Sequence, residues 1–138
     1  MKSPERLSPL VLAYIGDAVF ELHVREKLVN NVQEPVQALH EQAVNLVQAK
    51  AQAGILRRLE PFLTDVERDI VRRGRNAKSG FVPRHADVQD YRYSTGFEAL
   101  IGFLYLGGHK ERLSEILELA TAGITGVAGG EPPGPELK

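Results

Sequence analysis

The sequence predicts a single all-α domain, and three observations favour that class. Apolar residues recur at the spacing of three to four that is typical of helices, β-branched residues do not cluster, and no stretch alternates apolar and polar residues for long. The chain has 138 residues and no internal repeat, which suits one domain with its own core. Its content of 43% hydrophobic and 25% charged residues is that of an ordinary globular protein.

Composition excludes several kinds of function. There is no cysteine, so disulfides, thiolate zinc sites and a cysteine nucleophile are all excluded. The net charge is only -1, so any affinity for nucleic acid has to come from a local basic patch. No stretch has the length and apolar character of a signal peptide or a membrane span. We therefore expect a cytoplasmic protein that makes no membrane contact.

The first helix is predicted from residue 8 to about residue 28. Ser8 can cap its N-terminus, and Pro9 suits the first helical position. The helix is apolar nearly all round, so we expect it to be buried. One face carries Val11, Leu12, Ile15, Ala18, Val19 and Leu22, and the other carries Leu10, Ala13, Phe20 and Val24. Asp17 is the only charge between residues 8 and 20, and a buried carboxylate needs a partner.

Two further helical regions follow in the first half of the chain. Pro35 opens a helical stretch that Pro61 ends, and a break at Asn45 or Gly54 is expected to divide it into two helices. The sequence TDVE at 64–67 is a capping box, which predicts the start of the next helix. That helix is expected to run into the basic residues that begin at position 72.

The second half is predicted to contain a polar loop, two helices and a tail. The loop spans 75–90, and a helix over roughly 91–106 is ended by a pair of glycines at 107–108. An amphipathic helix follows within 109–124. The remaining residues are rich in glycine and proline, which predicts disorder. We therefore expect one domain over residues 1–122 and a disordered tail over 123–138.

A second lone acid repeats the pattern of the first. The predicted helix at 94–106 is apolar on every side, and Glu98 is its only charge. Small residues flank both acids: Gly16 and Ala18 in the first helix, and Gly96, Ala99 and Gly102 in the second. If the two helices cross at these small residues, Asp17 and Glu98 meet, and a divalent cation such as Mg²⁺ would relieve their repulsion. Two alternatives remain open: each acid pairs with an arginine or caps a helix, or the two form an acid–base pair without metal.

A basic segment precedes the Glu98 helix. Residues 70–86 contain no Asp or Glu. The candidate residues for contact with a nucleic-acid backbone in this segment are Arg72, Arg73, Arg75, Asn76, Lys78 and Arg84. Arginine suits phosphate because its planar fork binds two oxygens at once. Phe81 is the only aromatic residue here, which favours contact with the backbone of a duplex over base stacking. The alternative is a solvated surface segment with no ligand.

Several motifs together resemble the ribonuclease III family. LAYIGDAVFEL at 12–22 is similar to the family's signature, and STGFEALIGFLYL at 94–106 is similar to its second acidic motif. RRGRNAKSG and DVQDYRYSTGFEAL resemble the compact Mini-III branch, which lacks a double-stranded RNA-binding domain. The resemblance covers about residues 7–119. It implies a ribonuclease III-type helical endonuclease domain in which Asp17 and Glu98 are catalytic and bind metal.

Three positions depart from the family pattern. Leu10, Ala13 and Thr95 stand where the family usually has acids. The resemblance therefore leaves open whether one or two metal ions bind at each site. Water, Thr95 or RNA phosphates would then complete the ligand shell, or one Mg²⁺ would suffice.

The function implied by the resemblance is metal-dependent endoribonuclease activity on double-stranded RNA. The expected ion is Mg²⁺, with Mn²⁺ as the alternative, and the expected assembly is a homodimer. The implied substrate is the precursor of large-subunit (23S) ribosomal RNA, cut with or without a ribosomal protein as helper. The implied location is the cytoplasm, or a plastid if the chain comes from a plant. The rival functions are a non-catalytic RNA-binding module of the same fold, acting in ribosome assembly, and a structural helical dimer that binds a protein.

Overall fold

The fold of the described residues is entirely helical. A computed structural model describes residues 3–31, 35–78 and 87–122, and this part of the chain contains no strand. None of its helices is long and apolar enough to cross a membrane. The α-helices are α1 (Pro9–Asn31), α2 (Val36–Val47), α3 (Ala49–Leu59), α4 (Asp65–Asn76), α5 (Val88–Leu106) and α6 (Lys110–Ala120), and the short 3-10 helices are η1 (Pro4–Arg6) and η2 (Glu60–Phe62). The predicted all-α class is confirmed, whereas the predicted tail at 123–138 lies outside the described residues.

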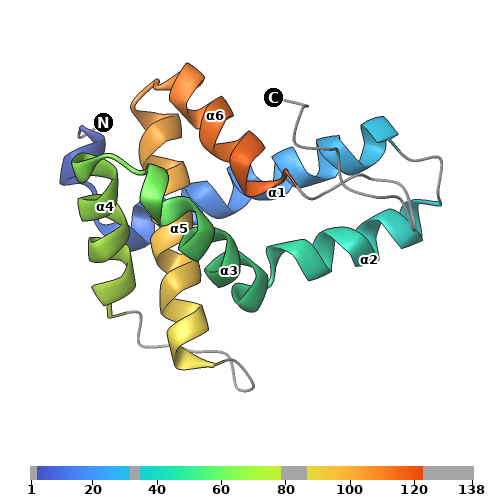
Figure 1. Ribbon diagram of the computed structural model, residues 1–138, viewed down its shortest axis with the longest axis horizontal. Helices are drawn as coiled ribbons and strands as arrows, with labels where there is room; N and C mark the ends of the chain where they lie inside the picture. The colour runs from blue at the N-terminus through green and yellow to red at the C-terminus, as the bar shows by residue number, and fades with distance from the viewer. Residues whose placement is uncertain (1–2, 32–34, 79–86, 123–138) are drawn as a thin grey trace.

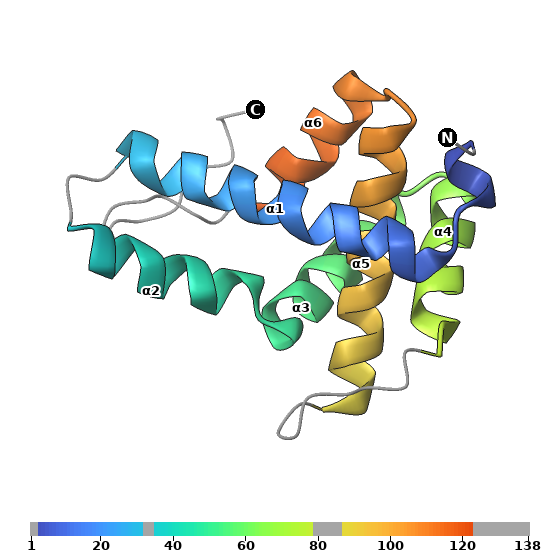
Figure 2. The same cartoon turned by 180° about the vertical axis from the view of Figure 1, so that it is seen from behind.

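Helix α5 is the centre of the molecule. Helices α1, α3 and α4 pack around it, and α6 folds back over its C-terminal end (Figures 1 and 2). From Ser94 to Leu104 every residue of α5 except Glu98 is buried. A helix that is apolar on all sides needs cover on all sides, and the surrounding helices provide it.

Helices α1 and α5 cross with their backbones in contact. A Cβ atom added at Gly16 would lie 1.8 Å from the carbonyl oxygen of Glu98, and one added at Gly102 would lie 1.9 Å from the carbonyl oxygen of Leu12. No side chain fits at either position, because the obstacle is main chain on a rigid helix. The crossing that the small residues predicted is therefore present, and α1 passes in front of α5 in Figure 2.

The expectation that α1 is buried all round is wrong. Ser8 does cap the helix, since its Oγ accepts a hydrogen bond of 3.2 Å from the amide of Val11, but the helix continues to Asn31. The buried side consists of Leu12, Ala13, Gly16, Phe20, Val24 and Leu28. The outer side exposes Val11, Tyr14, Ala18 and Leu22 to solvent. The core-facing side thus combines Leu12 from one predicted face with Ala13, Phe20 and Val24 from the other. The opposite side is not covered by other parts of the described chain.

The break between α2 and α3 falls at Gln48. This residue has an extended backbone, with ψ at 153°, and it separates the two helices. The predicted pair of helices is confirmed, but the break is at neither Asn45 nor Gly54. Its position follows from packing: α2 lies along the second half of α1, whereas α3 turns to pack on α5 (Figures 1 and 2).

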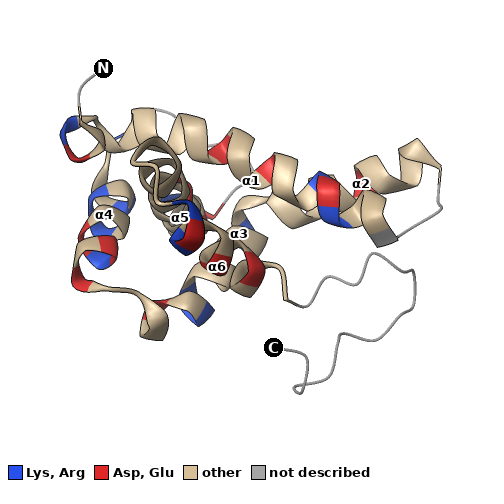
Figure 3. Cartoon of the chain, turned by 90° about the horizontal axis from the view of Figure 1, so that it is seen from above, with Lys and Arg blue, Asp and Glu red and all other residues tan. Residues whose placement is uncertain are grey.

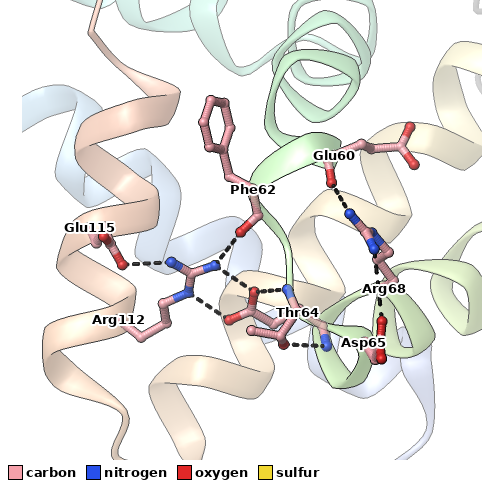
Figure 4. Close-up of polar contacts among 8 residues, drawn as sticks. Glu60, Phe62, Thr64, Asp65, Arg68, Arg112 and Glu115 are labelled. Carbon is pink, nitrogen blue, oxygen red and sulfur yellow. Dashed lines mark hydrogen bonds and ion pairs between the residues drawn. The ribbon is translucent and has the colours of Figure 1, made fainter.

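The start of α4 is held by local and distant contacts together. Thr64 and Glu67 form the predicted capping box. The Glu67 carboxylate is buried, and the guanidinium of Arg112 on α6 donates two hydrogen bonds of 2.7 Å to it. Figure 4 shows Arg112 reaching from α6 toward this turn, where it also donates to the carbonyl of Phe62 at 2.8 Å. This cluster ties α6 to the start of α4.

The ends of α5 are set by ordinary capping. The helix begins at Val88, earlier than predicted, because the Asp87 side chain accepts a hydrogen bond of 3.0 Å from the amide of Asp90. It ends at the glycine pair as predicted, and Gly108 has a φ of 73°, which favours glycine. Helix α6 is amphipathic as predicted, with Ile116, Leu117 and Ala120 buried.

Candidate active site

Asp17 and Glu98 meet beside the crossing of α1 and α5. Asp17 follows Gly16, whose Cα lies directly against the backbone of Glu98. The two carboxyl groups lie close enough for the charge of Asp17 and a hydrogen bond from it to raise the pKa of Glu98. Asp17 is exposed and Glu98 is half-buried, so the pair lies at the edge of the core with one acid facing solvent. The expectation that Asp17 is desolvated is therefore wrong, and the desolvated acid is Glu98.

The pair of acids has an unusual charge state. Burial is the largest cause that raises the pKa of Glu98 to about 8, and the neighbouring charge and hydrogen bond of Asp17 contribute to the same shift. The amide of Gln52 acts in the opposite direction and lowers the pKa of Glu98. At neutral pH, without a cation, the pair therefore retains a proton.

No basic side chain neutralises the pair within the described residues. Neither Asp17 nor Glu98 forms an ion pair with a Lys, Arg or His in residues 3–31, 35–78 and 87–122. Glu21, one turn after Asp17, pairs instead with Arg25. The alternative of an arginine partner for each acid thus finds no support in this part of the chain. Two adjoining carboxylates without a basic partner are a donor set that suits a hard divalent cation.

The pair is the whole acidic complement of the site in the described part of the chain. No group of three His, Cys, Asp or Glu residues that could hold a metal ion occurs among these residues. Of the positions that are usually acidic in the resembling family, Ala13 is buried and Leu10 is at the surface. The Thr95 hydroxyl donates to the carbonyl of Tyr91 at 3.0 Å, which leaves its oxygen lone pairs available.

Gln52 is the residue of this site that sequence reasoning missed. It lies on α3 with an exposed fraction of 1%, and its Nε2 has no hydrogen-bond partner among the described residues. The amide lies close enough to Glu98 to lower its pKa, although the contact does not meet the geometry of an ordinary hydrogen bond. One signal was available: Gln52 shares the buried face of α3 with Leu56 and Leu59.

The predicted basic segment does not form one surface. The second half of α4 carries Arg72, Arg73 and Arg75, and the first half carries the acids of this helix (Figure 3). Arg72 pairs with Asp69 and faces solvent. Arg73 donates to the backbone carbonyls of Glu5 at 3.2 Å and Leu7 at 3.3 Å, so it anchors the segment before α1. Residues two apart on a helix point to nearly opposite sides, which separates Arg73 from Arg75.

Arg75 belongs to a second cluster, at the N-terminal half of α5. Its guanidinium lies 5.2 Å from the ring centre of Tyr93 and donates to the Tyr93 hydroxyl at 3.3 Å. Arg57 of α3 lies over the same ring at 4.8 Å and pairs with Asp90 at 3.6 Å. Sequence analysis did not indicate Arg57, because its neighbours along the chain gave no sign of a phosphate site. Asn76 and Lys78 are exposed at the end of α4, and Arg84 lies outside the described residues.

Comparisons with known proteins identify the family of this chain. Residues 10–109 match the ribonuclease III domain family. The chain is 56% identical over 114 residues to Mini-ribonuclease 3 of Thermoanaerobacter, covering 83% of this chain and 80% of the relative. It is 53% identical over 120 residues to Mini-ribonuclease 3 of Symbiobacterium thermophilum, covering 87% of this chain and 92% of the relative.

A solved structure also matches the fold. A crystal structure of a protein from Fusobacterium nucleatum superimposes with a TM-score of 0.79 at 29% identity, covering 89% of this chain and 98% of that one. The family match contains both lone acids and the helix crossing between them. The chain therefore belongs to the ribonuclease III family, and its relatives place it in the Mini-ribonuclease 3 branch.

Proposed function

We propose that the protein is a metal-dependent endoribonuclease that cleaves double-stranded RNA. Membership of the ribonuclease III family supports endoribonuclease activity. The observation that carries the metal dependence is the Asp17–Glu98 pair, in which two carboxyl groups meet with no basic partner in the described part of the chain. In this proposal Mg²⁺, or Mn²⁺ in its place, is held by these two acids.

The bound cation would lower the pKa of a water molecule and neutralise charge on the scissile phosphate. The chain's own contribution is positional. Gly16 and Gly102 let the two helix backbones touch, and this contact fixes where the Asp17 and Glu98 carboxyl groups stand. Because Asp17 is exposed, a phosphate can approach the pair from solvent. Because no third acid joins this pair in the described part of the chain, water and RNA oxygens would supply the remaining ligands.

We assign contact with the RNA backbone to the basic residues near the N-terminal half of α5. Arg57 and Arg75 both lie over the Tyr93 ring, and Asn76 and Lys78 follow at the end of α4. Since guanidinium groups already cover Tyr93, this ring is poorly placed to stack on a base. Phosphate contact is the remaining use of such a cluster, and it favours a duplex. Arg72 and Arg84 stay candidates, whereas the backbone contacts of Arg73 suit an anchoring role.

We further propose a homodimer that buries the outer side of α1. Val11, Tyr14 and Leu22 have exposed fractions of 47%, 80% and 59%, and they share one side of the helix. Apolar side chains repeated at helical spacing on the surface are typical of a helix-to-helix interface. A second copy presenting the same side would cover them through two-fold symmetry.

The cellular substrate is proposed from the family resemblance alone. It is the precursor of large-subunit (23S) ribosomal RNA, with a ribosomal protein as helper where the RNA has to be shaped first. A cytoplasmic location likewise stays a prediction.

The decisive test is cleavage of a defined RNA duplex by the purified full chain. Cleavage is expected with Mg²⁺ or Mn²⁺ and not with EDTA, and the single strands of the same duplex should remain intact. Asp17→Asn and Glu98→Gln should lose cleavage and keep their helical circular dichroism, while the control Glu21→Gln should stay active. Metal-dependent cleavage by both site variants would contradict the assignment of Asp17 and Glu98 as the metal-binding acids. Salt-sensitive duplex binding without any cleavage would instead favour the non-catalytic RNA-binding rival.

A further inference from the structure

Gln52 is a buried polar side chain with an unsatisfied hydrogen-bond donor. Its exposed fraction is 1%, yet its Nε2 donates to nothing among the described residues. An unsatisfied buried amide donor is unfavourable, and native proteins contain few of them. The residues beside it on the buried side of α3, Ala53, Ile55 and Leu56, are apolar. An apolar residue of the same size would therefore suit the packing at least as well.

The group that lies near the Gln52 amide indicates the role of this side chain. Helix α3 packs on α5, and the Gln52 amide lies close enough to the carboxyl group of Glu98 to lower the pKa of that group. The same carboxyl group also interacts with Asp17. Glu98 is thus close both to an exposed acid and to a buried amide donor. A neutral donor can hold a carboxylate in place without competing for a cation, whereas a Lys or Arg would repel that cation.

We propose that Gln52 is a positioning residue for the divalent cation, which orients the Glu98 carboxylate by donating to it from the core side. This inference rests on the proposed function, in which Asp17 and Glu98 hold the ion. When the ion is bound, Glu98 is ionised, and the Nε2 donor then gains a charged acceptor. Carboxylates that ligate metals are commonly held by such a partner, and loss of the partner weakens metal binding by about 10- to 100-fold.

Loss of the Gln52 amide is expected to maintain or raise the stability of the protein and to lower its affinity for the cation. Gln52→Met removes the amide and keeps a side chain of similar length and volume. The variant should be as stable as the parent or more stable, because an unsatisfied buried donor has been replaced by an apolar group. Its affinity for the cation should nevertheless fall by about 10-fold or more. A purely structural glutamine would give the reverse pattern, with lower stability and unchanged affinity.

The experiment titrates Mn²⁺ into the RNA-free full chain and follows the free ion by electron paramagnetic resonance. Parent, Gln52→Met, Gln52→Leu and the control Gln48→Met are compared at one pH, and urea unfolding of each is measured in EDTA. Gln48 is a matched control because it is exposed and lies at the start of the same helix. The control should bind Mn²⁺ as the parent does.

The outcomes separate this inference from the proposed function. If the parent binds Mn²⁺ and Glu98→Gln does not, the cation site stands. Weaker binding in the folded Gln52 variants then supports the positioning role, and binding within about twofold of the parent overturns it. If the parent does not bind Mn²⁺, or binds it equally well after Glu98→Gln, the proposed cation site itself has failed. A lower rate of RNA cleavage by the Gln52 variants that is restored at a higher Mn²⁺ concentration would also support the positioning role.

Discussion

The most exacting stability prediction concerns Arg112. Its guanidinium donates to both oxygens of the Glu67 carboxylate at 2.7 Å, and Glu67 has an exposed fraction of only 4%. Arg112→Met keeps the apolar stem but leaves this carboxylate with the Thr64 amide, at 2.9 Å, as its remaining donor in the described part of the chain. Removing one partner of a buried ion pair costs about 3–5 kcal/mol.

That loss is large for a domain of this size. Small proteins unfold with a free energy of about 5–15 kcal/mol, so the variant should lose about a fifth of its stability or more. The lost bond between Arg112 and the carbonyl of Phe62 adds to the effect, because it ties α6 to the turn before α4 (Figure 4). Urea unfolding followed by far-ultraviolet circular dichroism measures the difference.

Two comparisons isolate the cause. Glu115 pairs with the same guanidinium but its side chain is 60% exposed, so Glu115→Gln should cost less than about 1 kcal/mol. Adding Glu67→Gln to Arg112→Met removes the stranded charge and should recover part of the loss. If Arg112→Met is no more costly than Glu115→Gln, Glu67 does not depend on Arg112 and the reasoning is refuted.

The same pair predicts a pH dependence. The hydrogen bonds from Arg112 are the main cause that lowers the pKa of Glu67 below its ordinary 4.5. A carboxyl group with a lowered pKa in the folded state contributes stability above its unfolded pKa, and that contribution is lost as the pH falls through the folded pKa. The gap in stability between the parent and Arg112→Met should therefore narrow as the pH falls below about 4.5.

Four further predictions concern the site and its surroundings. Glu98→Gln should stabilise the metal-free protein at pH 8 by up to about 5 kcal/mol, and its effect on stability at pH 5 should be small. The reason is that the pKa of Glu98 is about 8 in the folded state against an ordinary 4.5, so ionisation of Glu98 between these pH values destabilises the folded state. Gly102→Ala should destabilise by at least about 2 kcal/mol in urea unfolding, because its Cβ would lie 1.9 Å from a main-chain oxygen. Tyr14→Glu should convert the proposed dimer into a monomer in sedimentation analysis, since this side chain is 80% exposed on the outer side of α1. Arg57→Gln and Arg75→Gln should each reduce the salt dependence of RNA binding by about one unit of slope in a filter-binding titration.

Each of these has a control and a contrary result. An equal response of Glu98→Gln at both pH values would contradict the raised pKa. Gly54→Ala is the control for Gly102, because a Cβ there meets nothing within 4 Å and a gain of about 0.5–1 kcal/mol is expected. Tyr105→Glu is the control for the dimer, since Tyr105 is 55% exposed on α5, and a Tyr14→Glu dimer would exclude this interface. Arg68→Gln on α4 is the control for RNA binding, and unchanged salt slopes in both arginine variants would remove their cluster from the RNA site.

Local signals in the sequence proved reliable where all the interacting groups lie within one turn. Neighbours in the chain form the capping box of Thr64 and Glu67 and the helix end at Gly108. Both can therefore be predicted from the sequence without knowledge of the tertiary structure. The break between α2 and α3 was placed wrongly because it depends on two different packing partners. Residue Gln48 carries no local signal that α2 lies on α1 and α3 on α5.

The candidate site was legible only in part. Asp17 and Glu98 stood out because each is the only charge in a long apolar stretch of the sequence, at 8–20 and at 94–106. Gln52 did not stand out, because glutamine is common on helix surfaces and only its burial gives it meaning. The basic segment was legible as composition, yet its arginines point in different directions once they lie on α4, and Arg57 joins Arg75 from another helix.

The sequence by itself determined the helical class, the two lone acids and the small residues that let their helices touch. These follow from side-chain periodicity and from the cost of placing a charge among apolar neighbours. Tertiary structure decided which side of α1 is covered, which acid is desolvated and which polar groups reach the pair. Those outcomes depend on contacts between residues far apart in the chain, and the pattern of any one helix does not contain them.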